Sequence, residues 1–176
     1  YQEDDNLLGL LLCLNAIGKV SNRLGDYDRA LDMSNRAFDL ADRITNKEGK
    51  ARALYNIADT YSRQGHRDRA LDLFERALRV SREMNLRELT RDIYKHMSDL
   101  HAAGGAFQEA LEYLSLHMSL GDSLLNEALS RNISAMKVMY ETEQRDRENI
   151  MLRQENKHRQ AIIERDRGVL LLVCIL

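Results

Sequence analysis

The sequence predicts an all-α fold, a right-handed α-solenoid of three helical hairpins with a 40-residue period, followed by a long C-terminal helix. Three observations carry this prediction: apolar residues at helical spacing, an internal repeat, and the absence of proline from all 176 residues. Apolar residues three and four positions apart share one face of a helix. Proline inside a helix costs about 3 kcal/mol, so its absence suits a chain of continuous helices.

The clearest hairpin lies between residues 51 and 80. Its first half places four residues on one helix face: Leu54, Ile57, Ala58 and Tyr61. Its second half restarts the spacing with Ala70, Leu71, Phe74, Ala77 and Leu78. Gln64 and Gly65 interrupt the period between the two halves. The segment therefore predicts two amphipathic helices joined by one turn.

The hairpin repeats along the chain. Three glycines stand 40 residues apart, at Gly25, Gly65 and Gly105, and each is followed five residues later by an alanine: Ala30, Ala70 and Ala110. Glycine suits the left-handed residue that ends many helices. Small side chains recur where two helices cross closely, so we expect these alanines at the contact within each hairpin.

The period and the turn residues place the individual helices. We expect them at about residues 6–24, 27–44, 48–64, 67–84, 87–103 and 107–121, with further turns at Thr45-Asn46 and Asn85. One hairpin cannot bury its own apolar face, so the three must stack into a solenoid with a concave side.

A different pattern begins after Gly121. No glycine or proline interrupts Asp122–Arg167, which predicts one helix of about 45 residues, roughly 65 Å long. Five apolar residues follow three- and four-residue steps and predict a homodimer seam: Leu125, Leu129, Ile133, Met136 and Tyr140. The positions that continue these steps are mostly polar, so a solvated helix face is the alternative.

The chain ends in the apolar residues 169–176, which follow Gly168. A bilayer span needs about 20 residues, so we expect the start of a truncated transmembrane helix, with a buried C-terminal plug as the alternative. The first residue is Tyr1 rather than methionine, and we expect the chain to be a piece of a longer protein. The expected division is a repeat domain at 1–122, a charged connector at 123–167 and the membrane segment at 168–176.

Composition argues against several kinds of site. The net charge of −2 comes from well-mixed charges, so no basic stripe predicts nucleic-acid binding. The five histidines lack metal-ligand spacing, and no glycine-rich phosphate loop or hydrolase motif is present. Cys13 and Cys174 do not suggest a disulfide framework. We therefore expect no cofactor, no metal and no enzymatic activity in this segment.

The hairpin pattern resembles the tetratricopeptide repeat over about residues 7–122. The middle copy matches all eight positions of that family's pattern: Leu54, Ile57, Ala58, Tyr61, Gly65, Ala70, Phe74 and Ala77. The outer copies depart from this pattern at Ser21 and Ser34 in the first and at His101 and His117 in the third. The period of 40 residues also exceeds the family's usual ~34.

The resemblance implies that the concave groove binds a protein or an extended peptide. Transferring the family's inner-face positions gives these candidate residues: Asn15, Lys19, Asn22, Tyr55, Asn56, Asp59, Ser62, Arg63, Lys95, His96 and Asp99. Ordinary solvated groove residues are the alternative for each of them.

The order of repeats, charged helix and apolar end is similar to the input half of bacterial membrane-bound signalling proteins. That likeness implies a periplasmic or otherwise extracytoplasmic sensor domain. Its output would be a histidine kinase, a diguanylate cyclase or a transcriptional regulator beyond the C-terminus. The alternatives are a soluble scaffold or adaptor and a cytoplasmic peptide-pheromone receptor.

Overall fold

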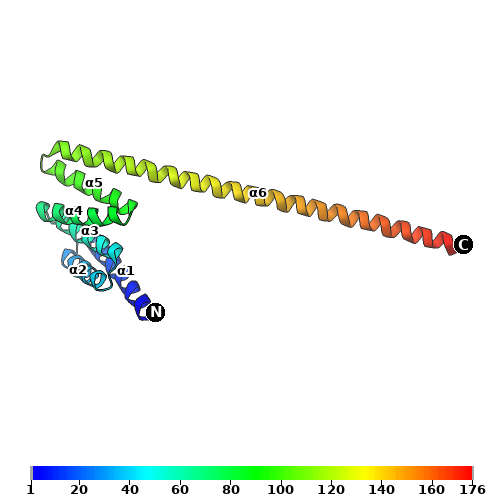
Figure 1. Ribbon diagram of the computed structural model, residues 1–176, viewed down its shortest axis with the longest axis horizontal. Coiled ribbons are helices and arrows are strands. Elements are labelled where there is room, and N and C mark those ends of the chain that lie inside the picture. The colour runs from blue at the N-terminus through cyan, green and yellow to red at the C-terminus, as the bar shows by residue number, and fades with distance from the viewer. Residues whose placement is uncertain (1, 176) are drawn as a thin grey trace. The chain divides into compact units, whose positions relative to one another are not determined.

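Six helices make up the part of the chain that the structure, a computed structural model, describes, which is residues 2–175, with side chains for residues 6–160. Their bounds are α1 (Gln2–Arg23), α2 (Tyr27–Arg43), α3 (Lys47–Arg63), α4 (Arg67–Glu83), α5 (Arg87–Ala103) and α6 (Phe107–Ile175). Figure 1 shows α1 to α5 and the beginning of α6 running back and forth as hairpins. The all-α solenoid predicted from the sequence is confirmed.

The connections between these helices, within residues 2–175, are all three residues long and alike in geometry. Each contains one residue with positive φ, and these residues recur every 20 positions: Gly25, Thr45, Gly65, Asn85 and Gly105. At the middle turn the Gly65 N–H donates to the Ser62 carbonyl (3.0 Å) and the His66 N–H to the Tyr61 carbonyl (2.9 Å). This pair of bonds closes the helix end and reverses the chain. The turns predicted from the sequence are confirmed.

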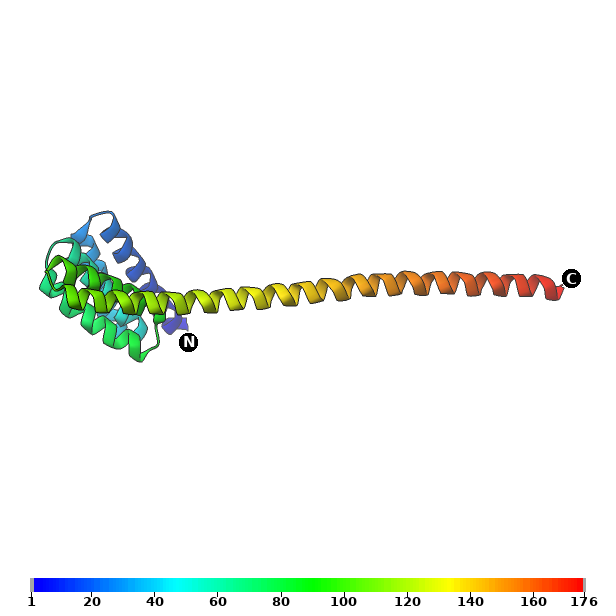
Figure 2. The ribbon, with the colours of Figure 1, turned by 90° about the horizontal axis from the view of Figure 1, so that it is seen from above.

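The hairpins stack because each covers its neighbour. Helix α3 packs against α1, α2, α4 and α5, although α1 and α5 are distant from it in sequence. Figure 2, a view from above, shows these helices lying over one another. The three predicted contact alanines are buried, with Ala30 and Ala70 at 0% exposure and Ala110 at 6%. Close crossing of the two helices in each hairpin thus leaves room only for small side chains.

Phe74 is the largest fully buried side chain of the stack. It belongs to a core with Leu54 and Ala58 from its own hairpin and Ile93 and Met97 from the next one. A core shared between hairpins makes the stability of each depend on its neighbour.

The predicted helix boundary near Gly121 is wrong. Helix α6 runs without interruption from Phe107 to Ile175, so the second helix of the third hairpin and the predicted connector are one element. A helix interior tolerates glycine at a cost of about 1 kcal/mol. Gly105 adopts a positive φ and lies in the turn before α6, whereas Gly121 has no positive φ and is not followed by proline. Nothing therefore ends the helix at Gly121.

The chain divides into two units, Tyr1–Leu124 and Leu125–Leu176. In the second unit the five predicted seam residues are between 50% and 70% exposed, so the homodimer remains a prediction. Among the described residues, no helix combines the length and apolar character needed to cross a membrane. The side chains of residues 168–176, predicted to begin a membrane helix, lie outside the described part.

Replacing Phe74 by alanine leaves a cavity in the shared core, and we expect the free energy of unfolding to fall by about 3–5 kcal/mol. Phe107→Ala is the matched control, because Phe107 is 69% exposed and its loss should change stability by less than about 0.5 kcal/mol. Chemical denaturation followed by circular dichroism measures both. Equal effects of the two substitutions would contradict the assigned core.

Candidate functional site

Two adjoining hollows mark the inner side of the repeat unit. The first, of about 360 Å³, lies across the first helices of the hairpins and is lined by Leu12, Asn15, Ala16, Lys19, Glu48, Arg52, Tyr55, Asn56, Glu88, Leu89 and Asp92. The second, of about 300 Å³, is lined by Tyr55, Arg91, Asp92, Lys95, His96, His117 and Gly121. Tyr55 and Asp92 line both hollows, so the two form one surface, which we call the groove.

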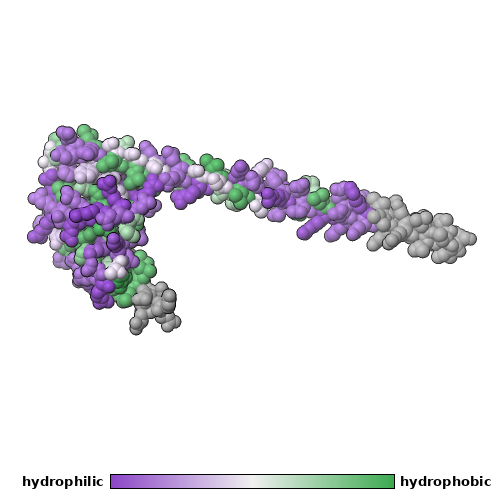
Figure 3. All heavy atoms as spheres, viewed as in Figure 1, coloured by the Kyte–Doolittle hydropathy of each residue, from purple (hydrophilic) through white to green (hydrophobic). Residues whose placement is uncertain are grey.

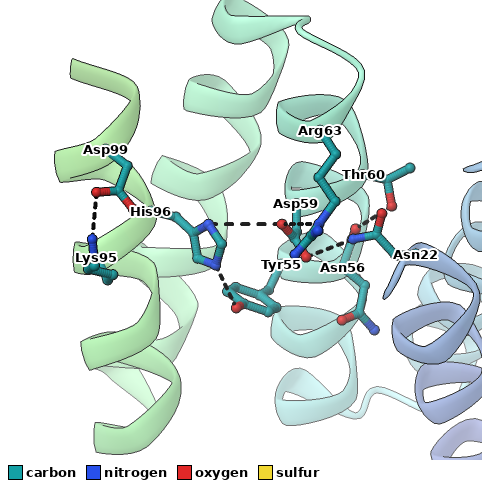
Figure 4. Close-up of polar contacts among 9 residues, drawn as sticks. All are labelled: Asn22, Tyr55, Asn56, Asp59, Thr60, Arg63, Lys95, His96 and Asp99. Atoms are coloured by element: carbon teal, nitrogen blue, oxygen red, sulfur yellow. Dashed lines mark hydrogen bonds and ion pairs between the residues drawn. The ribbon is translucent and has the colours of Figure 1, made fainter. Parts of the chain in front are cut away.

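A polar cluster links the three layers of helices beside the groove (Figure 4). The Tyr55 hydroxyl on α3 lies 3.0 Å from Nε2 of His96 on α5. The other ring nitrogen of His96 lies 3.9 Å from Asp59 Oδ1. Asp59 also accepts hydrogen bonds from Asn22 Nδ2 on α1 (2.7 Å) and from Arg63 Nε (3.1 Å). The Asp59 carboxylate is therefore the centre of a network that joins α1, α3 and α5.

Burial sets the protonation of this cluster. Burial, followed by the nearby Asp59 carboxylate, raises the pKa of the Tyr55 phenol well above its usual value of 10.0. Burial lowers the pKa of His96 below its usual 6.5, and Asp59 opposes that change. A protonated phenol beside a neutral imidazole means that the Tyr55 O–H donates to Nε2 and the ring proton sits on Nδ1, facing Asp59.

Aromatic packing fixes the position of the His96 ring. It stacks on Phe74 with a centroid separation of 5.2 Å and an interplanar angle of 16°. Tyr55 meets both rings edge-on, at 5.7 Å from Phe74 and 5.5 Å from His96. The side of the groove at Tyr55 and His96 is thus continuous with the hydrophobic core and rigid for that reason.

Three of the predicted groove residues are buried amides that join helices. Asn15, Asn22 and Asn56 are 7%, 2% and 6% exposed. Asn56 Nδ2 donates to the Asn15 backbone carbonyl (3.0 Å), and Asn15 Nδ2 donates to the Gly49 carbonyl (3.4 Å). With the Asn22–Asp59 bond, these contacts fasten α1 to α3. The amide hydrogens that they use are not available to a ligand.

The other predicted residues lie nearer to solvent. Lys19, Arg63, Lys95 and Asp99 are exposed, and Ser62 is half-buried. Lys95 Nζ pairs with Asp99 Oδ1 at 2.6 Å, one turn further along α5. Lys19 and Lys95 line the groove, whereas Ser62, Arg63 and Asp99 are not among the residues that line the two hollows.

Several residues that line the groove were not predicted from the sequence. They are Leu12, Ala16, Glu48, Arg52, Glu88, Leu89, Arg91, Asp92, His117 and Gly121. The repeat itself contained the signal, because Leu12, Arg52 and Asp92 stand 40 residues apart, one turn before the predicted positions. Among the described residues, no group of three potential metal ligands converges.

Solved structures share this fold. The tetratricopeptide repeat domain of FLU from Arabidopsis is 16% identical, with a TM-score of 0.61, covering 66% of this chain and 98% of that one. Aspartyl phosphate phosphatase F from Bacillus subtilis is 24% identical (TM-score 0.60; 65% of this chain, 30% of that one). The apo form of RapI is 16% identical (TM-score 0.59; 65% and 42%).

These likenesses establish the architecture, and the chain spans less than half the length of the phosphatase and of RapI. No curated protein sequence matches the chain. Residues 10–83, which comprise most of the first hairpin and all of the second, match the tetratricopeptide repeat family. Repeats of this kind serve protein–protein interaction, and the match shows tetratricopeptide repeats over these residues, which are less than half of the chain.

Proposed function

We propose that the groove binds an extended segment of a partner protein or a peptide. The observation that carries this proposal is the continuity of the two hollows across α1, α3, α5 and the part of α6 at His117 and Gly121. Such a surface offers an extended chain contacts along several residues, as the concave faces of helical repeat arrays do. The rigid side formed by Tyr55 and His96 supports binding without a large ordering cost.

The lining favours a polar ligand that carries both charges. Basic groups come from Lys19, Arg52, Arg91 and Lys95, and acidic groups from Glu48, Glu88 and Asp92. Arg52 already pairs with Glu48 (2.9 Å) and Arg91 with Asp92 (2.8 Å), while both arginines stay partly exposed. A peptide with alternating charges would form ion pairs with these side chains in place of the pairs that they form with each other. Such exchanges fix the register of the peptide in the groove more than they raise its affinity.

We further propose that this binding unit is the input part of a membrane-anchored signalling protein. The order of repeats, the continuous helix α6 and the apolar residues 169–176 supports this role. A ligand shifts such a protein only by binding one arrangement more tightly than another, and α6 would convey that preference. A soluble scaffold or adaptor and a cytoplasmic peptide receptor are the rival roles.

Groove binding is tested with a display library of short linear peptides, selected on the full chain. Peptides from this selection should bind Lys19→Ala or Arg91→Ala variants about two- to fivefold more weakly, because each removes a cation of the lining whose pairing at a partly exposed site contributes about 0.5–1 kcal/mol. Arg36→Ala is the control, since Arg36 pairs with Asp32 on α2 outside the groove. Affinities come from calorimetry. If the affinity of the peptides falls only in the Arg36→Ala variant, the binding surface lies outside the groove and the proposal is wrong.

The membrane role predicts the coding sequence after Leu176. About twelve further apolar residues should follow, to complete a span of about 20, and basic residues should come next on the cytoplasmic side. Sequencing the natural gene past this point decides between the roles. A polar continuation would exclude the membrane sensor and favour the scaffold or the cytoplasmic receptor, whichever way the peptide experiment turns out.

A further inference from the structure

Helix α1 has an apolar face that nothing covers in the described part of the chain. Cys13, Ile17 and Val20 follow each other at four- and three-residue steps, which places them on one side of the helix. Ile17 is 38% exposed, Val20 is 55% exposed, and Cys13 is a free, exposed thiol. Figure 3 shows hydrophobic surface gathered at the α1 end of the repeat unit.

The same register is fully covered in the other two hairpins. One period further on, Ala53, Ile57 and Thr60 of α3 are 0%, 6% and 0% exposed. Two periods further on, Ile93, Met97 and Leu100 of α5 are 0%, 0% and 8% exposed. The first helix of each hairpin therefore packs against the preceding hairpin through these positions.

The covering helix is always the second helix of the preceding hairpin. Ala53 of α3 packs in a cluster with Ala37, Leu40 and Ala41 of α2. In the next layer, Ala77 of α4 shares a core with residues 93 and 97 of α5. The occupant of this register is thus an amphipathic helix with small residues on its apolar side.

The face of α1 has nearly the same shape as the face of α3. Ile17 corresponds to Ile57, and Val20 to Thr60, which has the same branched outline. Cys13 corresponds to Ala53, so both are small. A helix like α2 therefore fits α1 as α2 fits α3.

Near the start of α1, which begins at Gln2, the sequence repeats that of the α3 boundary. Asn6 and Gly9 stand one period before Asn46 and Gly49, where the Asn46 side chain accepts the Gly49 N–H at 2.7 Å. A Cβ on Gly49 would meet the Leu11 side chain of the preceding hairpin, whereas a Cβ on Gly9 would meet nothing within 4 Å. The space that Leu11 fills beside Gly49 is open beside Gly9.

We propose that α1 is an internal repeat boundary, and that its open face receives the second helix of a further hairpin of the same 40-residue repeat, preceding α1 in the polypeptide. Terminal repeats of soluble arrays present a polar outer face. The face at Cys13, Ile17 and Val20 has the opposite character. A second copy of this chain is the competing occupant.

The experiment adds such a hairpin in register and uses Cys13 as the reporter. A copy of residues 7–46 is joined directly to residue 7, so that the connection 44–46 of the copy leads into α1. Cys13→Ala in the copy and Cys174→Ser leave the original Cys13 as the single thiol. The parent chain carries Cys174→Ser alone. The control fusion adds Ala41→Asp in the copy, because Ala41 is 0% exposed in α2.

The rate of Cys13 modification by a thiol reagent should fall at least about tenfold in the fusion, and should recover in the control fusion. The melting temperature of the fusion should exceed that of the parent. Equal modification rates in all three chains would overturn the proposal, as would a fusion that melts below the parent. Concentration-dependent protection of Cys13 in the parent would also overturn it, because a second copy would then cover the face.

Discussion

The whole repeat unit depends on one constraint: a helical hairpin has more apolar surface than its two helices can cover for each other. Phe74 shows the consequence, since it lies on α4 and is buried among residues of its own hairpin and of the next one. Stacking at a constant period is the solution that this sequence uses. Stacking requires that each helix and its turn have the same length. A residue with positive φ every 20 positions ends each helix at the same point of the repeat.

The hairpins and their turns could be predicted because they rest on local rules. Glycine at positions 25, 65 and 105 and alanine five residues later are visible without any knowledge of tertiary contacts. The end of the third hairpin could not be predicted in the same way. Gly121 resembles a turn residue by type, but the continuation of α6 depends on the absence of any competing cap or break. A glycine alone does not end a helix.

The groove could be predicted only in outline. Family positions identified Tyr55 and His96, which do lie together, but could not distinguish a side chain that faces solvent from one that fastens two helices. Asn22 and Asn56 are of the latter kind, because their amides have partners on a neighbouring helix. A polar residue near a groove can either face solvent or hydrogen-bond to a neighbouring helix. Which of the two it does depends on the groups that the neighbouring helix places beside it. Arg52 and Asp92, which line the groove, were missed for another reason, because the positions transferred from the family begin one turn later in the first helix of each hairpin.

If stacking stabilises each hairpin, amide hydrogen exchange should report it directly. The middle hairpin, covered on both sides, should exchange most slowly, and α1, open on one side, should exchange faster. Residues 125–160 of α6, which are all exposed except the half-buried Ala128, should exchange fastest of all. Native-state exchange measured by mass spectrometry resolves these three segments. Protection of α1 equal to that of α3 would contradict the account, because it would show that the uncovered face of α1 does not lower the stability of the first hairpin.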